Sequence, residues 1–134
     1  TLGGLQQAHA EHKLLYMAHH PGRQRTLGQS LASLKGELTP EQLDSYHEQA
    51  QALMKTRLSR GKNVNVLQHM FGYVSKSLSQ ATRQHALSSI QNYAEGRANL
   101  QTPLTLVQHL IIDKGAHPWL EKQVFLNPFP APLT

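Results

Sequence analysis

The chain has 134 residues, a length that suits one domain with a single modest hydrophobic core. It contains no cysteine, which excludes a disulfide and a thiolate-held zinc or iron–sulfur site within these residues. Thirteen Lys plus Arg against eight Asp plus Glu give a net charge of +5, which favours anionic partners. No apolar run approaches the about 20 residues that span a bilayer, and no signal peptide is visible, so we expect a cytoplasmic protein with no membrane partner. The start at Thr1 and the Pro-rich end favour a piece of a longer chain.

Three helices are predicted before residue 59. The first runs from about residue 2 to residue 20 and ends at Pro21-Gly22, and the second runs from about residue 23 to residue 35 and ends at Gly36. The third has the strongest start signal in the chain, with Thr39 as N-cap, Pro40 at the first helical position and Gln42 completing a capping box. The residues predicted to face the core of this helix are Leu43, Tyr46, Ala50 and either Leu53 or Met54.

Four more helices are predicted after a loop at residues 59–62. One covers residues 65–77, and its core side carries Leu67, Met70, Phe71, Val74 and Leu78. Ser79 is predicted to cap the next, which ends at Gly96 and buries Leu87, Ile90 and Tyr93. Thr102 and Pro103 predict a cap and start for a helix that reaches Gly115, and residues 118–126 predict a last short helix.

No alternating strand pattern interrupts these helices. The proline-rich segment 127–130 should be extended and should pack Phe129 against the helices, because prolines at this density cannot continue a helix. We therefore expect an all-α fold, a single compact bundle of about seven helices with a Pro-rich C-terminal tail, formed by residues 1–134 as one domain.

Two predicted helices carry a polar face opposite their core face. On the first, His9, Lys13, Tyr16 and His20 lie within about 60° of one another at 100° per residue. Imidazole, ammonium and phenol groups suit phosphate oxygens and an exposed base, although a solvated face with Tyr16 half buried and His9 bonded to a neighbouring helix would give the same pattern. The corresponding polar face of the helix at 65–77 carries Asn65, His69, Gly72 and Lys76. We expect the two faces to act as one surface. Tyr73 beside them either stacks on a base or belongs to the core.

A basic interval surrounds the second polar face. Between Glu48 and Glu95 there is no acidic residue, and the interval carries Lys55, Arg57, Arg60, Lys62, Lys76 and Arg83. One or two cations near residue 55 would serve a helix C-terminus, so the surplus favours contacts with phosphates. Asn65, Gln68 and His69 can donate to a phosphate, a ribose or a base edge.

Metal binding and catalysis find little support in the sequence. Among nine histidines, His9 and His12 are the one pair three residues apart, and no pair is four apart, so we predict no metal site. No cysteine, no Gly-x-Ser-x-Gly motif and no phosphate-cradling glycine loop is present, so we predict no catalytic residue in this domain.

Short motifs spread over the whole chain have an order and a spacing that resemble those of one family. They are His9 to Lys13 with Leu14-Leu15 and Ala18-His19, Arg25-Thr26-Leu27-Gly28, Asn65 to His69 with Gly72-Tyr73, Tyr93 with Gly96, Pro103-Leu104 with His109, and Trp119-Leu120 with Gln123. In these motifs the chain resembles the YbgA-like domain family, a bacterial family found alone or fused behind a cysteine-containing desulfidase domain. Departures from the family pattern are Asn63 for a common His, Val74 and Leu110 for aromatics, and Asn99 for a common Pro.

The resemblance implies a substrate-recognition role in the removal of sulfur from 4-thiouridine in tRNA. We therefore expect an RNA-binding module that presents thiolated tRNA to a fused or partner desulfidase domain, with no cofactor of its own because an iron–sulfur cluster would belong to that partner. The residues expected to bind nucleic acid are His9, His12, Lys13, Tyr16, His19, Arg25, Arg57, Arg60, Lys62, Asn63, Asn65, His69, Tyr73 and Lys76. Two alternatives stay open: a small enzyme acting on a nucleotide or thiolated base, and a helical protein-interaction domain. The enzyme would use a pocket formed by His9, Lys13, His69 and His109.

Overall fold

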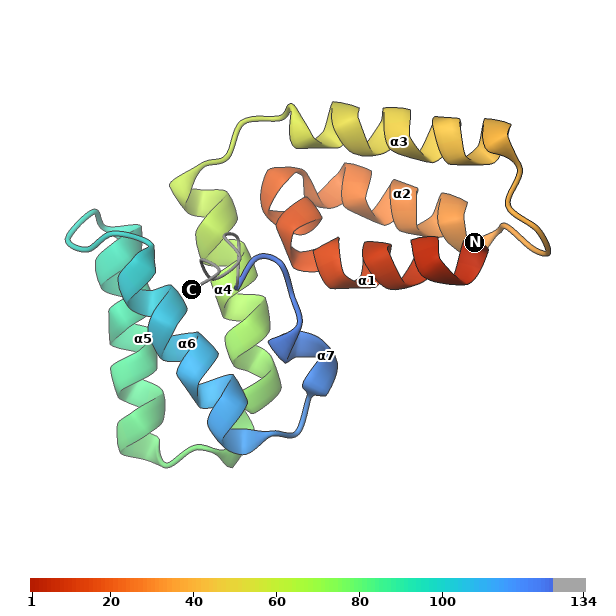
Figure 1. Ribbon diagram of the computed structural model, residues 1–134. Coiled ribbons are helices and arrows are strands. Elements are labelled where there is room, and N and C mark those ends of the chain that lie inside the picture. Colours follow the sequence, from red (N-terminus) through yellow and green to blue (C-terminus); the bar gives the residue numbers. More distant parts are fainter. Residues whose placement is uncertain (127–134) are drawn as a thin grey trace, which may run out of the picture.

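Helices account for all the regular structure in residues 1–126, the range that the computed structural model describes (Figure 1). The elements are α1 (Leu2–His19), α2 (Pro21–Ala32), α3 (Pro40–Met54), α4 (Arg60–Val74), the short 3-10 helix η1 (Ser75–Ser77), α5 (Gln80–Ala94), α6 (Gln101–Lys114) and α7 (Pro118–Glu121). The predicted all-α fold of about seven helices is confirmed. The extended segment predicted at residues 127–130, with Phe129, lies outside the described residues. Within residues 1–126, no helix combines the length and the hydropathy needed to cross a bilayer.

Local signals set most helix boundaries. The capping box of Thr39 and Gln42 is confirmed, as is the cap by Ser79, whose side chain accepts from the backbone N–H of Thr82. Between α1 and α2 the chain turns at His20, whose backbone is extended because the following Pro21 disfavours a helical conformation there. The Nδ1 atom of His20 accepts a hydrogen bond from the N–H of Arg23. This histidine therefore caps α2.

Two predicted helix starts are wrong. The loop predicted at residues 59–62 is the N-cap and first turn of α4, because the hydroxyl of Ser59 accepts from the N–H of Lys62 and begins the helix five residues before its predicted start at residue 65. Thr102 does not cap α6, which begins at Gln101 with Leu100 in the cap position and no side-chain cap bond.

Two predictions about helix length and burial also need correction, and one open choice is decided. The last helix ends at Glu121 rather than at residue 126. Leu87, predicted to be buried, is 41% exposed, because the buried side of α5 runs through Ala86, Ile90 and Tyr93. On α3 it is Leu53 rather than Met54 that is buried.

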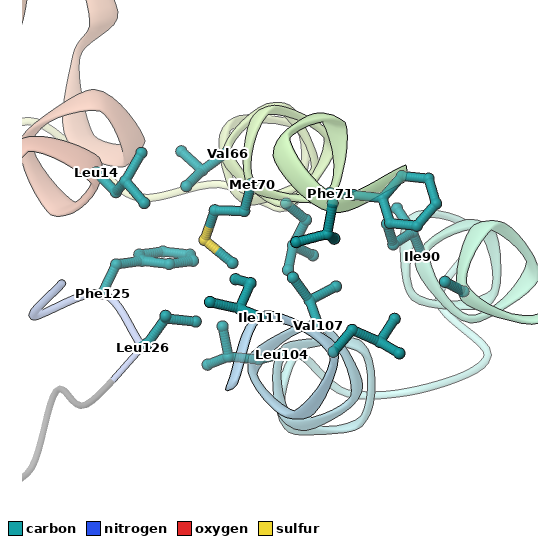
Figure 2. Close-up of a cluster of buried hydrophobic side chains, with 14 of the residues drawn as sticks. Leu14, Val66, Met70, Phe71, Ile90, Leu104, Val107, Ile111, Phe125 and Leu126 are labelled. Atoms are coloured by element: carbon teal, nitrogen blue, oxygen red, sulfur yellow. The ribbon is translucent and has the colours of Figure 1, made fainter. Parts of the chain in front are cut away.

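The hydrophobic interior consists of two clusters rather than the one expected core. The larger joins α1, α4, α5, α6 and the segment after α7, and Figure 2 shows its side chains converging between α4 and α6. The smaller lies between α1, α2 and α3 and contains Tyr16, Leu27, Leu31, Tyr46, Ala50 and Leu53. Helix α1 belongs to both, with Leu14 and Ala18 in the larger cluster and Tyr16 in the smaller. The molecule in Figure 1 accordingly has α1, α2 and α3 on one side and α4, α5 and α6 on the other.

Gln123 ties the C-terminal segment to α1. Its side chain is buried, with its Oε1 accepting from the N–H of Leu14 at 3.0 Å and its Nε2 donating to the carbonyl of Ala10 at 2.7 Å. Those two backbone groups, four residues apart, are the pair that bond to each other in a regular α-helix. The N–H of Val124 also donates to the carbonyl of Glu11. The chain must leave the helical conformation after Glu121 to make these bonds, which explains the short α7.

Candidate nucleic-acid interface

An exposed aromatic cluster lies where α1, α4 and α7 meet. Tyr73 of α4 is 45% exposed and Trp119 of α7 is 38% exposed, and their ring centroids lie 5.2 Å apart with the planes nearly perpendicular. The ring of His117 lies 5.3 Å from that of Tyr73. The Nζ atom of Lys13 lies over the Trp119 ring, 5.9 Å from its centroid. We refer to Lys13, Tyr73, His117 and Trp119 as the Trp119 cluster.

The Trp119 cluster has the chemistry of a surface that binds unpaired bases. Aromatic faces stack on nucleobases of any sequence, and an adjacent ammonium can contact the phosphate of the same nucleotide. His69 lies one helical turn before Tyr73 on α4 and is also exposed, and Gly72 and Lys76 continue this exposed side. The predicted polar face of α4 is therefore confirmed, and Tyr73 belongs to it rather than to the core.

Two of the four residues of the predicted polar face of α1, His9 and Tyr16, turn toward α3 instead. The Nδ1 atom of His9 lies 2.9 Å from the hydroxyl of Tyr46, and the His9 ring packs against the buried ring of Tyr16. Burial, together with the positive charges of Lys13 and His12, lowers the pKa of His9. Burial and a hydrogen bond with Tyr16 raise the pKa of Tyr46. These contacts support the alternative in which Tyr16 is buried and His9 bonds to a neighbouring helix.

His12 and Arg25 lie at the edges of the half of the molecule that α1, α2 and α3 form. The ring of His12 stacks on Tyr16 with centroids 5.7 Å apart, and its Nδ1 atom bonds to the carbonyl of Ala8. Arg25 is exposed on α2. Lys13 is thus the residue through which the polar face of α1 meets that of α4, by way of Trp119.

A second group of predicted residues fastens the end of α1 to the segment between α3 and α4. The Nδ1 atom of the buried His19 bonds to the carbonyl of Thr56 at 2.9 Å. The ammonium of Lys62 donates to the carbonyls of His19 and Arg57, both at 2.7 Å. These bonds occupy two of the three donors of Lys62, which leaves one donor for another partner.

The remaining predicted residues lie near the start of α4. Arg57 and Arg60 are exposed, and the Arg60 guanidinium lies over the ring of Tyr93 at 5.9 Å. Asn63 is buried and donates to the Tyr93 hydroxyl, whereas Asn65 is partly exposed. Arg60 and Tyr73 are separated by about 20 Å along the helix axis, at roughly 1.5 Å per residue. The predicted site residues therefore form two surfaces at opposite ends of α4, rather than one.

Two members of the Trp119 cluster, His117 and Trp119, escaped prediction as site residues. Trp119 is the single tryptophan of the chain and part of the motifs that carry the family resemblance, but its contact with Tyr73 joins residues far apart in sequence. Helical periodicity places side chains around one helix, and cannot show which other helix comes to lie beside them.

The geometry gives little support to the enzyme alternative. His9 contacts Tyr16 and Tyr46, whereas Lys13 contacts Trp119, so the two side chains face different neighbours. His109 is exposed on α6. Among residues 1–126, no group of three or more His, Asp or Glu is close enough together to hold a metal ion.

Comparison with known proteins identifies the family to which this chain belongs. The chain is 29% identical over 136 residues to the "Uncharacterized protein YbgA" of Escherichia coli (strain K12), and the match covers 97% of this chain and 77% of that protein. No solved structure is a significant match. The model of the family described as "Protein of unknown function (DUF1722)" matches residues 13–130, a span that includes the whole Trp119 cluster, and the chain therefore belongs to this YbgA-like family.

Proposed function

We propose that this chain is an RNA-binding module that holds tRNA and presents thiolated tRNA to a desulfidase domain, either fused to it or separate. The observation that carries the proposal is the Trp119 cluster, in which two exposed aromatic rings lie in contact, with a Lys ammonium over one of them. Such an arrangement offers stacking to a base and charge to its phosphate, as proteins that bind unpaired nucleotides do.

The distribution of charge supports the same proposal. The interval from residue 49 to residue 94 holds six basic residues and no acidic one, so the rest of the chain, with seven basic and eight acidic residues, is close to neutral. Lys55, Arg57, Arg60 and Lys76 are exposed. Arg83 is committed to the fold, because its guanidinium donates to the carbonyls of Ser75 and Leu78. The exposed positive charge of this interval therefore lies at the two ends of α4, with Lys55, Arg57 and Arg60 near its start and Lys76 just past its end.

The desulfidase part of the proposal rests on the absence of cysteine from the chain and on its resemblance to the YbgA-like family. Without cysteine it cannot hold a thiolate-bound cluster, so sulfur chemistry would belong to a partner domain that supplies the iron–sulfur cluster. Recognition energy from the RNA body would then lower the KM of the partner for tRNA and not for a free thiolated base. The proposal includes a cytoplasmic location for this chain, because a tRNA substrate is found there.

Binding to tRNA should depend strongly on salt. If about four to six phosphates are neutralised, a plot of log affinity against log salt concentration should have a slope of roughly −3 to −5, because each contact releases condensed counterions. Fluorescence anisotropy of labelled total tRNA at several salt concentrations measures this slope. A flat response, or no binding near physiological salt, contradicts the RNA proposal and favours the protein-interaction alternative.

Replacement of Trp119 by Ala should weaken tRNA binding by about 5- to 150-fold, since stacking of one base on an aromatic side chain contributes roughly 1–3 kcal/mol. Lys13→Ala should also weaken binding, and should leave the free energy of unfolding within about 0.5 kcal/mol of the wild type. Ile112→Ala is the matched control, because Ile112 is an exposed apolar residue, 54% accessible, on α6. Equal affinities for tRNA in Trp119→Ala and Ile112→Ala would show that the Trp119 cluster is not the binding surface.

A further inference from the structure

A patch of basic side chains lies at the opposite end of α4 from the Trp119 cluster. The turn between α1 and α2 meets the segment that joins α3 to α4 there (Figure 1). The Thr56 hydroxyl and the Lys62 ammonium both donate to the carbonyl of His19, and the Arg23 guanidinium donates to the carbonyl of Ala52. These contacts bring together five basic residues from three parts of the sequence. We refer to Arg23, Lys55, Arg57, Arg60 and Lys62 as the Arg57 patch.

The charge of the Arg57 patch is available to a partner. Its side chains are exposed, except that of Lys62, which is partly buried. The bond from Lys62 to the carbonyl of Arg57 holds the backbone between α3 and α4 in place, so the cations project from a fixed segment. Glu95 lies next to Gly96, which packs against Arg60, but Glu95 is paired with Arg97. The patch is therefore a compact group of cations suited to phosphates.

The exposed aromatic rings lie at the other end of α4. Tyr73 and Trp119 are exposed, whereas every other Phe and Tyr residue within positions 1–126 is buried. Tyr93, the ring over which Arg60 lies, is 6% exposed. Surfaces that bind single strands combine cations with aromatic rings on which bases stack. The Arg57 patch offers cations without such rings, so it suits a paired stem, whose bases are already stacked inside the duplex.

The stretch of α4 between the two surfaces carries no charge. Residues 63–75 contain no Lys, Arg, Asp or Glu, and Arg60 and Tyr73 are about 20 Å apart along the helix axis. A single strand that crossed this stretch would leave its phosphates without cations and would lose its conformational freedom on binding. A stem is already ordered, and the unpaired nucleotides that adjoin it can reach the second surface. The arrangement therefore favours an RNA with both paired and unpaired parts.

We infer that the two surfaces bind one RNA where a paired stem adjoins unpaired nucleotides, with stem phosphates on the Arg57 patch and an unpaired base on Trp119. The inference rests on the proposed RNA function and deepens it, because it names the structural class of RNA that the module selects. Binding at one surface raises the effective concentration of the RNA at the other. An RNA that engages both surfaces therefore binds more tightly than a stem or a single strand alone.

Three RNAs test this inference on the unaltered protein. They are a blunt hairpin, the same hairpin with an extension of about six unpaired uridines, and the uridine strand alone, a length within the range that single-strand sites occupy. In fluorescence anisotropy at one salt concentration, the extended hairpin should bind at least about tenfold more tightly than either of the others. If the extended hairpin binds no more tightly than the blunt hairpin or the uridine strand, the inference is overturned.

The fluorescence of Trp119 shows which part of the RNA lies on it, because Trp119 is the single tryptophan of the chain. The uridine strand and the extended hairpin should quench this fluorescence by stacking, whereas the blunt hairpin should not, even at concentrations that saturate its anisotropy. Equal quenching by the blunt and the extended hairpin would show that the stem occupies the Trp119 cluster, which contradicts the assignment.

Charge removal tests the other surface. Arg57→Gln should make the salt dependence of blunt-hairpin affinity shallower by about one in the log–log slope, and its combination with Arg60→Gln by about two, one for each lost phosphate contact. Both arginines are exposed, and quenching of Trp119 by the uridine strand should be unchanged in these variants. Lys35→Gln is the matched control, because Lys35 is exposed beyond the far end of α2 from Arg23. An unchanged slope in the double variant would overturn the role of the Arg57 patch.

A parallel titration with tRNA distinguishes failure of this inference from failure of the proposed function. If tRNA binds and the three test RNAs do not differ in affinity, the selection of a stem with unpaired nucleotides is wrong, while the RNA function remains supported. If neither tRNA nor any of the three RNAs binds, the proposed RNA function itself is wrong. The expected result is binding of tRNA together with a clear preference for the extended hairpin.

Discussion

Replacement of Gln123 by Leu is expected to lower the free energy of unfolding by about 2–4 kcal/mol, because a buried N–H and a partly buried carbonyl of α1 each lose a hydrogen bond. The amide of Gln123 satisfies the N–H of Leu14 and the carbonyl of Ala10 at the same time. Without this amide, the segment after α7 loses two of the bonds that hold it against α1. Its release would expose Phe125 and Leu126, which belong to the larger cluster.

Denaturant unfolding followed by circular dichroism measures this loss. Gln68→Leu is the matched control, since Gln68 is exposed on α4 and the same substitution there should change the free energy of unfolding by less than about 0.5 kcal/mol. If the two variants unfold at the same denaturant concentration, the hydrogen bonds of Gln123 with α1 do not stabilise the fold.

Leu67→Ala should be at least as damaging, with a loss of about 2–5 kcal/mol, because the side chain is fully buried in the larger cluster and its removal leaves a cavity. Leu87→Ala is its matched control. Like Leu67, Leu87 is a leucine within a helix, but it is 41% exposed. Its truncation should therefore lower the free energy of unfolding by less than about 1 kcal/mol. Comparable losses in the two variants would mean that Leu87 packs on α5 as its sequence pattern predicts.

The sequence predicts helices well where a signal is local. Thr39 with Gln42, and Ser79 alone, determine their helix starts through bonds to residues three positions away, so these starts can be read directly. Ser59 makes the same kind of bond, yet the neighbouring Gly61 resembles a loop signal and conceals it. The end of α7 depends on a bond between Gln123 and a helix more than a hundred residues earlier, which no local pattern contains.

The same distinction applies to the candidate surfaces. The 100° rule places His69 correctly on the exposed side of α4, because that side depends on α4 alone. It also groups His9 with Lys13, but α3 covers one and α7 approaches the other, so the group divides. The contact of Arg60 with the Tyr93 ring joins α4 to α5, so no pattern within one helix contains it.

The division of the interior into two clusters gives α3 and α4 different surroundings, with α1 contributing to both. The smaller cluster holds α3 against α1 and α2 through a few buried side chains, whereas both ends of α4 are supported by the larger. Local opening requires breaking the contacts of one cluster and not of the whole, so the amides of α3 can exchange with solvent hydrogen while those of α4 stay protected. Faster hydrogen exchange in α3 than in α4 is therefore expected, and the helix that carries both candidate surfaces should keep its geometry in the state in which the smaller cluster has opened.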